Sequence, residues 1–148
     1  MIFEMVKKEK IFLLGVGAQK AGTTWISNLI NKHKAASCGM QKEYHIWDAK
    51  YLDDYKRFKV QHPNSINQNL NGFLRYHMQN TSDFYAGYFQ ALANQGDFKV
   101  VSDITPSYCE LSSDHFKKIK VGLEKYGFQV KVLFSLRDPV KEFGVLSE

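Results

Sequence analysis

Residues 11–30, which read IFLLGVGAQKAGTTWISNLI, decide the fold and divide into three parts. Residues 11–14 are a short apolar run bounded by glycine, which predicts a buried strand. Residues 15–22 are small apart from Gln19 and one cation, Lys20, and are expected to form a loop. From Thr23 onward apolar residues recur at helical spacing, so we expect a helix over 23–34. The stretch therefore predicts a strand, a glycine loop and a helix in that order.

This order is typical of a binding site for phosphate or a similar anion. Glycines let the backbone approach the anion closely, and free N–H groups at the start of a helix point toward it. Lys20 adds a positive charge, and Thr23 and Thr24 add hydroxyl donors. The alternative is an ordinary strand–turn–helix with a solvated lysine, but the order of these residues with Gly22 favours the anion site.

The loop differs from the P-loop of Walker-type ATPases. That pattern places Gly-Lys-Ser/Thr at the start of the helix, whereas here Gly22 is followed by Thr23 and the lysine lies two residues earlier. Residues 20–25, Lys-Ala-Gly-Thr-Thr-Trp, instead resemble the 5′-phosphosulfate loop of sulfotransferases, which use 3′-phosphoadenosine-5′-phosphosulfate (PAPS). The resemblance implies that this cofactor is bound by Gln19, Lys20, Ala21, Gly22, Thr23, Thr24 and Trp25.

A second motif, Lys-Glu-Tyr-His-Ile-Trp-Asp, occupies residues 42–48. On an extended segment Glu43 and His45 face the same side. The motif resembles a segment of sulfotransferases related to the heparan sulfate and bacterial enzymes, in which the glutamate is the general base. It implies that Glu43 accepts the proton of the acceptor, with His45 and Asp48 as its partners. The alternative is a solvated charged turn with a half-buried histidine.

A third motif, Ser-Asp-Ile-Thr-Pro-Ser-Tyr, covers residues 102–108. It resembles the Thr-Pro-x-Tyr segment that lines the active-site cleft of the same family. The resemblance implies that Thr105, Ser107 and Tyr108 contact the acceptor substrate. A plain turn is the alternative here.

A fourth motif, Arg-Asp-Pro, follows an apolar run at residues 137–139. It resembles the family's 3′-phosphate motif, and the planar guanidinium of Arg137 suits a phosphate. The positions where the family has a second basic residue and a serine hold Glu142 and Val145, so the resemblance extends to Arg137 alone. An Arg–Asp ion pair at the start of a helix is the alternative.

Short apolar strands are expected over 11–14, 98–101 and 129–136, with helices between them. This alternation predicts an α/β domain with a parallel sheet, in which ligands bind at the carboxyl ends of the strands. The resemblance implies a three-layer P-loop-like fold, a central parallel sheet flanked by helices. It also implies that residues 1–148 form a single domain, the N-terminal part of a longer family domain that is truncated at its C-terminus. Helices are also expected over 49–60, in the second half of 73–93, and over 112–126.

The composition is that of an ordinary globular protein, with 44% hydrophobic and 24% charged residues among 148. The net charge of +5 suits an anionic cofactor or an acidic substrate, and is too scattered to indicate nucleic acid. No apolar run is long enough for a signal peptide or membrane span, so we expect a cytoplasmic protein. No cluster has the spacing of metal ligands.

The expected function is PAPS-dependent sulfuryl transfer to a hydroxyl or amine of a small-molecule or carbohydrate acceptor, without a metal. Two alternatives remain. A P-loop-type nucleotide kinase would hold magnesium with Thr23 or Thr24 and Asp103. A non-catalytic module would bind the nucleotide without turnover.

Overall fold

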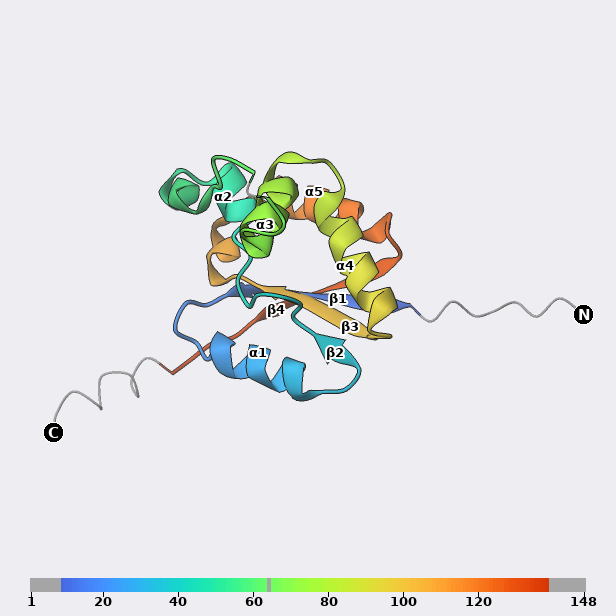
Figure 1. Cartoon of the computed structure of the whole chain (residues 1–148). Coiled ribbons are helices and arrows are strands. Elements are labelled where there is room, and N and C mark those ends of the chain that lie inside the picture. The colour runs from blue at the N-terminus through green and yellow to red at the C-terminus, as the bar shows by residue number, and fades with distance from the viewer. Residues whose placement is uncertain (1–8, 64, 139–148) are drawn as a thin grey trace, which may run out of the picture.

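A computed structural model of the chain describes residues 9–63 and 65–138 (Figure 1). The positions of Glu142 and Val145 therefore lie outside the described residues. The elements in chain order are β1 (Lys10–Gly17), α1 (Thr23–Lys32), β2 (Ala36–Ser37), α2 (Trp47–Tyr51), the 3-10 helix η1 (Asp53–Phe58), α3 (Leu70–Asn80), α4 (Phe84–Gln95), β3 (Val100–Ile104), the 3-10 helix η2 (Pro106–Glu110), α5 (Ser113–Glu124) and β4 (Phe128–Phe134).

The four strands form one sheet in the order β2-β3-β1-β4, and each neighbouring pair is parallel. β1 lies in the interior of the sheet, with Ile11 opposite Val100 of β3 and Lys10 opposite Phe128 of β4. Helix α1 covers one face, and α3, α4 and α5 lie over the other (Figure 1). The predicted α/β class, with a parallel sheet flanked by helices, is thus confirmed.

The main core lies between the sheet and the helices α4 and α5. Phe12, Leu14 and Val16 alternate along β1 and are buried, as expected for one face of a strand. The ring of Phe12 packs edge-on against Phe89 of α4, with 4.8 Å between ring centroids. Full burial of such a side chain contributes about 1.5–3 kcal/mol, so this packing fixes β1 and the loop that follows it.

β1 and β3 both extend beyond their predicted ends. β1 continues through Gly15, where an added Cβ would lie 2.7 Å from Ile104 Cγ2, so glycine here allows the two strands to approach closely. β3 begins later than predicted and includes residues 102–104, the first three residues of the third motif. Its polar residues Ser102 and Asp103 are fully buried. They belong to the strand because pairing with β1 outweighs their low strand propensity.

Two of the predicted helices have different limits. The single helix expected over 49–60 is wrong: α2 ends before Leu52, whose backbone is extended (φ −113°, ψ 128°), and η1 follows. The region 73–93 belongs to two helices, α3 and α4, and the side chain of Asn69 caps the first of them by accepting from the Gly72 N–H. Ser112 caps α5 by accepting from the His115 N–H.

Helix α1 begins at Thr23 as predicted but ends at Lys32. Its buried residues are the small Thr23 and Ser27, whereas the side chains of Trp25 and Leu29 are exposed. No helix in the described part of the chain is both long enough and apolar enough to cross a bilayer.

Candidate functional site

A cleft of about 680 Å³ lies where β1, β3 and β4 end at their carboxyl termini. Its volume is in the range typical of small-molecule sites. All four motifs contribute to its lining, which consists of Gln19, Lys20, Gly22, Thr23, Thr24, Lys42, Glu43, His45, Tyr55, Arg57, Phe58, Pro106, Ser107 and Arg137. The sheet therefore gathers segments that are far apart in the sequence into one site.

The loop 18–22 is tied to the end of β4. The Ala18 N–H donates to the Ser135 carbonyl at 2.9 Å, and the Ser135 N–H donates to the Gly17 carbonyl at 2.8 Å. Gly22 is the N-cap of α1 with φ of +80°, and no side chain caps this helix. The first two amides of α1, those of Thr23 and Thr24, thus belong to residues that line the cleft, an arrangement suited to an anion.

Two of the cations that line this cleft follow different strands. Lys20, in the loop after β1, has an exposed side chain. Arg137 lies two residues beyond Ser135, whose hydrogen bonds to the end of β1 hold the chain there, and its side chain is also exposed. Pairing of β1 with β4 therefore places both side chains in the lining of the same cleft.

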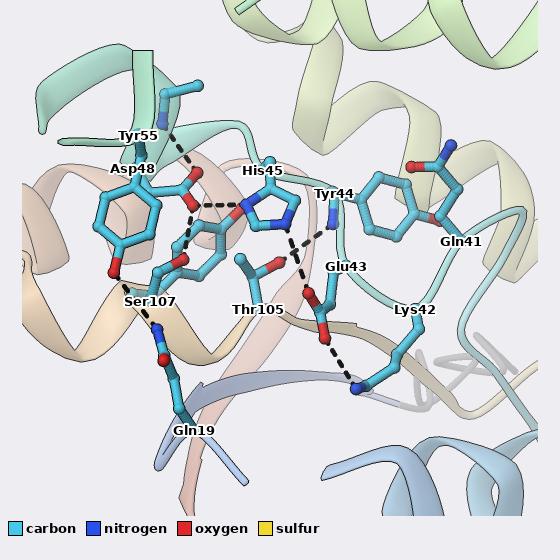
Figure 2. A network of polar contacts seen from close by, with 12 residues as sticks. Gln19, Gln41, Lys42, Glu43, Tyr44, His45, Asp48, Tyr55, Thr105 and Ser107 are labelled. Atoms are coloured by element: carbon cyan, nitrogen blue, oxygen red, sulfur yellow. Dashed lines mark hydrogen bonds and ion pairs between the residues drawn. The ribbon is translucent and has the colours of Figure 1, made fainter. Parts of the chain in front are cut away.

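A chain of charged groups runs along one wall of the cleft (Figure 2). Lys42 Nζ lies 2.7 Å from Glu43 Oε1, and Glu43 Oε2 lies 3.3 Å from His45 Nε2. His45 Nδ1 lies 2.6 Å from Asp48 Oδ2, which also accepts a hydrogen bond from the Ser107 hydroxyl at 2.6 Å. The side chain of Glu43 is 34% exposed and that of Asp48 is fully buried, so the chain leads from solvent into the core.

These contacts set the charge states of Glu43 and His45. The hydrogen bond from His45, together with Lys42, lowers the pKa of Glu43 to about 2 against the opposing effect of burial. Burial lowers the pKa of His45, but its hydrogen bonds to Asp48 and Glu43 outweigh burial and raise it to about 9. At neutral pH, Glu43 is therefore ionised and His45 is protonated. Of the two, the carboxylate is the group in the proton-accepting form.

We predict that Asp48→Asn returns the pKa of His45 from about 9 toward its ordinary value of 6.5, because a neutral amide replaces the charged partner. An NMR titration of the His45 ring protons measures this shift. The raised pKa of His45 contributes stability that is fully present below pH 6.5 and is lost as pH rises through about 9. In the Asp48→Asn variant this decrease in stability at high pH should be absent.

Ser107→Ala is the matched control for this variant, since it removes one hydrogen bond to Asp48 but leaves the carboxylate charge. The pKa of His45 should stay high in this control. A pKa near 9 in Asp48→Asn itself would show that Asp48 does not stabilise the imidazolium.

The expected donor-site residues mostly lie in the cleft. Gln19, Lys20, Gly22, Thr23 and Thr24 all line it. Ala21 and Trp25 are not among its lining residues, and the side chain of Trp25 is 68% exposed.

The residues expected at the base and the acceptor are divided between the cleft wall and the layer behind it. Glu43 and His45 lie side by side on the wall, as expected, and Ser107 also lines the cleft. Asp48 lies behind His45. Thr105 and Tyr108 are fully buried and hydrogen-bond backbone amides of residues 44–46.

Five lining residues were missed by the sequence analysis: Lys42, Tyr55, Arg57, Phe58 and Pro106. The ring of Phe58 stacks on His45 with 3.7 Å between centroids, and the Arg57 guanidinium lies 4.7 Å from the Phe58 ring centroid. The helix breaks at Leu52, and η1 follows as a separate element. The sequence analysis expected one continuous helix over 49–60, so it did not indicate that residues of η1 reach the cleft. Lys42 was visible as the first residue of its motif.

Comparison with protein-family models, with curated proteins and with solved structures gave no match. Within residues 9–63 and 65–138, no group of three or more His, Cys, Asp and Glu side chains is placed to hold a metal ion. The functional assignment therefore depends on the chemistry of the cleft.

Proposed function

We propose that this chain is a PAPS-dependent sulfotransferase that transfers the sulfuryl group to a hydroxyl or amine of a small-molecule or carbohydrate acceptor. The observation that carries the proposal is the meeting of Lys20, Arg137 and Glu43 in one cleft. Two cations suit the two anionic ends of the donor, and an ionised carboxylate suits the acceptor's proton. The proposal includes a P-loop-like identity for the sheet and the loop 18–22, and a relation to the N-terminal part of the family domain.

The donor would be held at its two ends. Lys20, the first amides of α1 and the hydroxyls of Thr23 and Thr24 would bind the 5′-phosphosulfate. As the sulfur–oxygen bond to the leaving phosphate breaks, Lys20 would neutralise the charge that develops on the bridging oxygen. Arg137 would bind the 3′-phosphate through paired hydrogen bonds. As in phosphoryl transfer, positioning and charge stabilisation supply most of the catalysis.

Glu43 would accept the acceptor's proton while the new bond to sulfur forms. A carboxylate whose pKa is about 2 is a weak base toward a resting hydroxyl. The proton therefore moves as the acceptor oxygen attacks and becomes acidic. Lys42 contacts both Glu43 and the Thr24 hydroxyl, the latter at 2.9 Å, so displacement of Lys42 by a bound acceptor would strengthen the base.

The geometry counts against the kinase alternative. Asp103, its candidate magnesium ligand, is fully buried, and its carboxylate accepts hydrogen bonds from Tyr85, Thr105 and Tyr108. These donors occupy the oxygens that a cation would need. A non-catalytic module would bind the nucleotide at the same site, so only a measurement of turnover distinguishes it from a sulfotransferase.

A thermal-shift experiment tests the proposal. Adenosine 3′,5′-bisphosphate, the product form of the donor, should stabilise the protein by about 2.7 kcal/mol at one hundred times its dissociation constant. Equal or larger stabilisation by Mg-ATP would favour the kinase. Stabilisation by the bisphosphate without transfer to any acceptor would favour the non-catalytic module.

A further inference from the structure

We propose that Asp103 is a positioning residue that holds the backbone of residues 44–46 through two hydroxyl groups, and so places Glu43 and His45. The inference rests on the proposed function, because that function makes Glu43 and His45 the reacting pair. Asp103 lies near the end of β3 and is fully buried.

Two hydroxyl groups connect Asp103 to the segment. The Thr105 hydroxyl donates to Asp103 Oδ1 at 2.6 Å and accepts from the Tyr44 N–H at 3.0 Å. The Tyr108 hydroxyl donates to Asp103 Oδ2 at 2.9 Å and accepts from the Ile46 N–H at 3.1 Å. The two held amides lie immediately before and after His45.

An ionised carboxylate fixes the direction of both connections. It has acceptors only, so each hydroxyl must point its hydrogen at Asp103 and present a lone pair to a backbone N–H. Burial raises the pKa of Asp103 to about 6, although the hydroxyls of Thr105, Tyr85 and Tyr108 oppose this rise. At neutral pH Asp103 is therefore ionised. A neutral amide would place a donor against one of the hydroxyls and weaken that connection.

The backbone of His45 needs such a support. Its φ of +52° is in the left-handed region, which is unfavourable for a residue with a side chain and persists where the surroundings fix it. Besides the two flanking amides, Gln79 Nε2 donates to the His45 carbonyl at 2.8 Å. Together these contacts hold the backbone from which the imidazole reaches Glu43 Oε2 at 3.3 Å.

Fold stability alone is a poor explanation for this carboxylate. The folded pKa of Asp103 is raised from 3.8 to about 6, so between these values the native state binds more protons than the unfolded state. The contribution of Asp103 to stability therefore falls as pH rises from 3.8 to about 6. At neutral pH the ionised carboxylate therefore contributes less to stability than the protonated acid contributes at low pH.

Amide hydrogen exchange followed by NMR on the whole chain tests the positioning role without any assay of chemistry. In Asp103→Asn, the Tyr44 and Ile46 amides should exchange about tenfold faster, because both hydroxyl connections weaken. Tyr108→Phe should accelerate the Ile46 amide selectively. Ser102→Ala is the matched control, since Ser102 is buried next to Asp103 on β3 but its hydroxyl donates to Cys38 Sγ at 3.1 Å, and it should leave both amides unchanged.

Two exchange results would overturn the proposal. One is unchanged exchange of Tyr44 and Ile46 in Asp103→Asn. The other is an equal acceleration of core strand amides such as Leu14 and Val101, which would indicate a general loss of stability.

Transfer kinetics give the second readout. Asp103→Asn should lower kcat about tenfold or more while the affinity for adenosine 3′,5′-bisphosphate stays unchanged, because the variant leaves Lys20 and Arg137 in place. An unchanged kcat in an otherwise active enzyme would overturn the positioning role. Selective amide acceleration in a chain that never transfers sulfate would instead overturn the sulfotransferase proposal and leave the positioning of the segment standing.

Discussion

Glu43→Gln is expected to lower sulfuryl transfer by roughly 10²–10⁴-fold, the usual contribution of a general base, with donor binding retained. The amide keeps the shape of the side chain but does not take up the acceptor's proton. The matched measurements are the rate of adenosine 3′,5′-bisphosphate formation and the affinity for that nucleotide. Only the first should change.

Glu124→Gln serves as the control for this variant, because it also neutralises one carboxylate but on the outer surface of α5, where the side chain is 47% exposed. Its transfer rate should equal that of the unmodified chain. Near-normal transfer by Glu43→Gln at every pH would remove Glu43 from the mechanism and make His45 the next candidate base.

Lys20→Ala should damage transfer far more than folding. The Lys20 side chain is exposed, so the free energy of unfolding should change by no more than about 0.5 kcal/mol. In the proposed mechanism Lys20 neutralises charge on the leaving oxygen, so its loss should lower transfer by roughly 10²–10³-fold. Thermal melts followed by circular dichroism, together with transfer rates, separate the two effects.

Lys34→Ala is the matched control for Lys20→Ala, because Lys34 is an exposed lysine beyond the far end of α1. It should change neither quantity. An unfolded Lys20→Ala protein would mean that Lys20 is needed for the fold and would contradict the proposed role.

The class of fold was predictable because the strands that carry it are short apolar runs bounded by glycine or followed by a charged motif. The ends of the strands were not predictable, because they depend on pairing with other strands that are distant in the sequence. Ser102 and Asp103 belong to β3 because β1 pairs with them, although their side chains favour turns. The break at Leu52 likewise separates two short helices that local periodicity had merged.

The site was predictable where its residues are close in sequence. The extended spacing of Glu43 and His45 predicted that they face the same side, and the resemblance implied Asp48 as a further partner. In the structure Glu43 lies 3.3 Å from His45, and His45 lies 2.6 Å from Asp48. Phe58 was missed because only the path of η1 carries it onto the imidazole. Thr105 and Tyr108 lie behind the cleft wall, and a linear motif does not say which side of a strand end a side chain occupies.

The central claim is that this cleft binds a nucleotide with phosphate at both the 5′ and 3′ positions. Isothermal titration calorimetry without magnesium, comparing adenosine 3′,5′-bisphosphate with adenosine 5′-monophosphate, tests it most directly. A charged hydrogen bond contributes about 1.5–3 kcal/mol, so the bisphosphate should bind at least about tenfold more tightly. Arg137→Ala should abolish that difference. Equal affinities in the unmodified protein, or tighter binding of Mg-ATP than of the bisphosphate, would contradict the account.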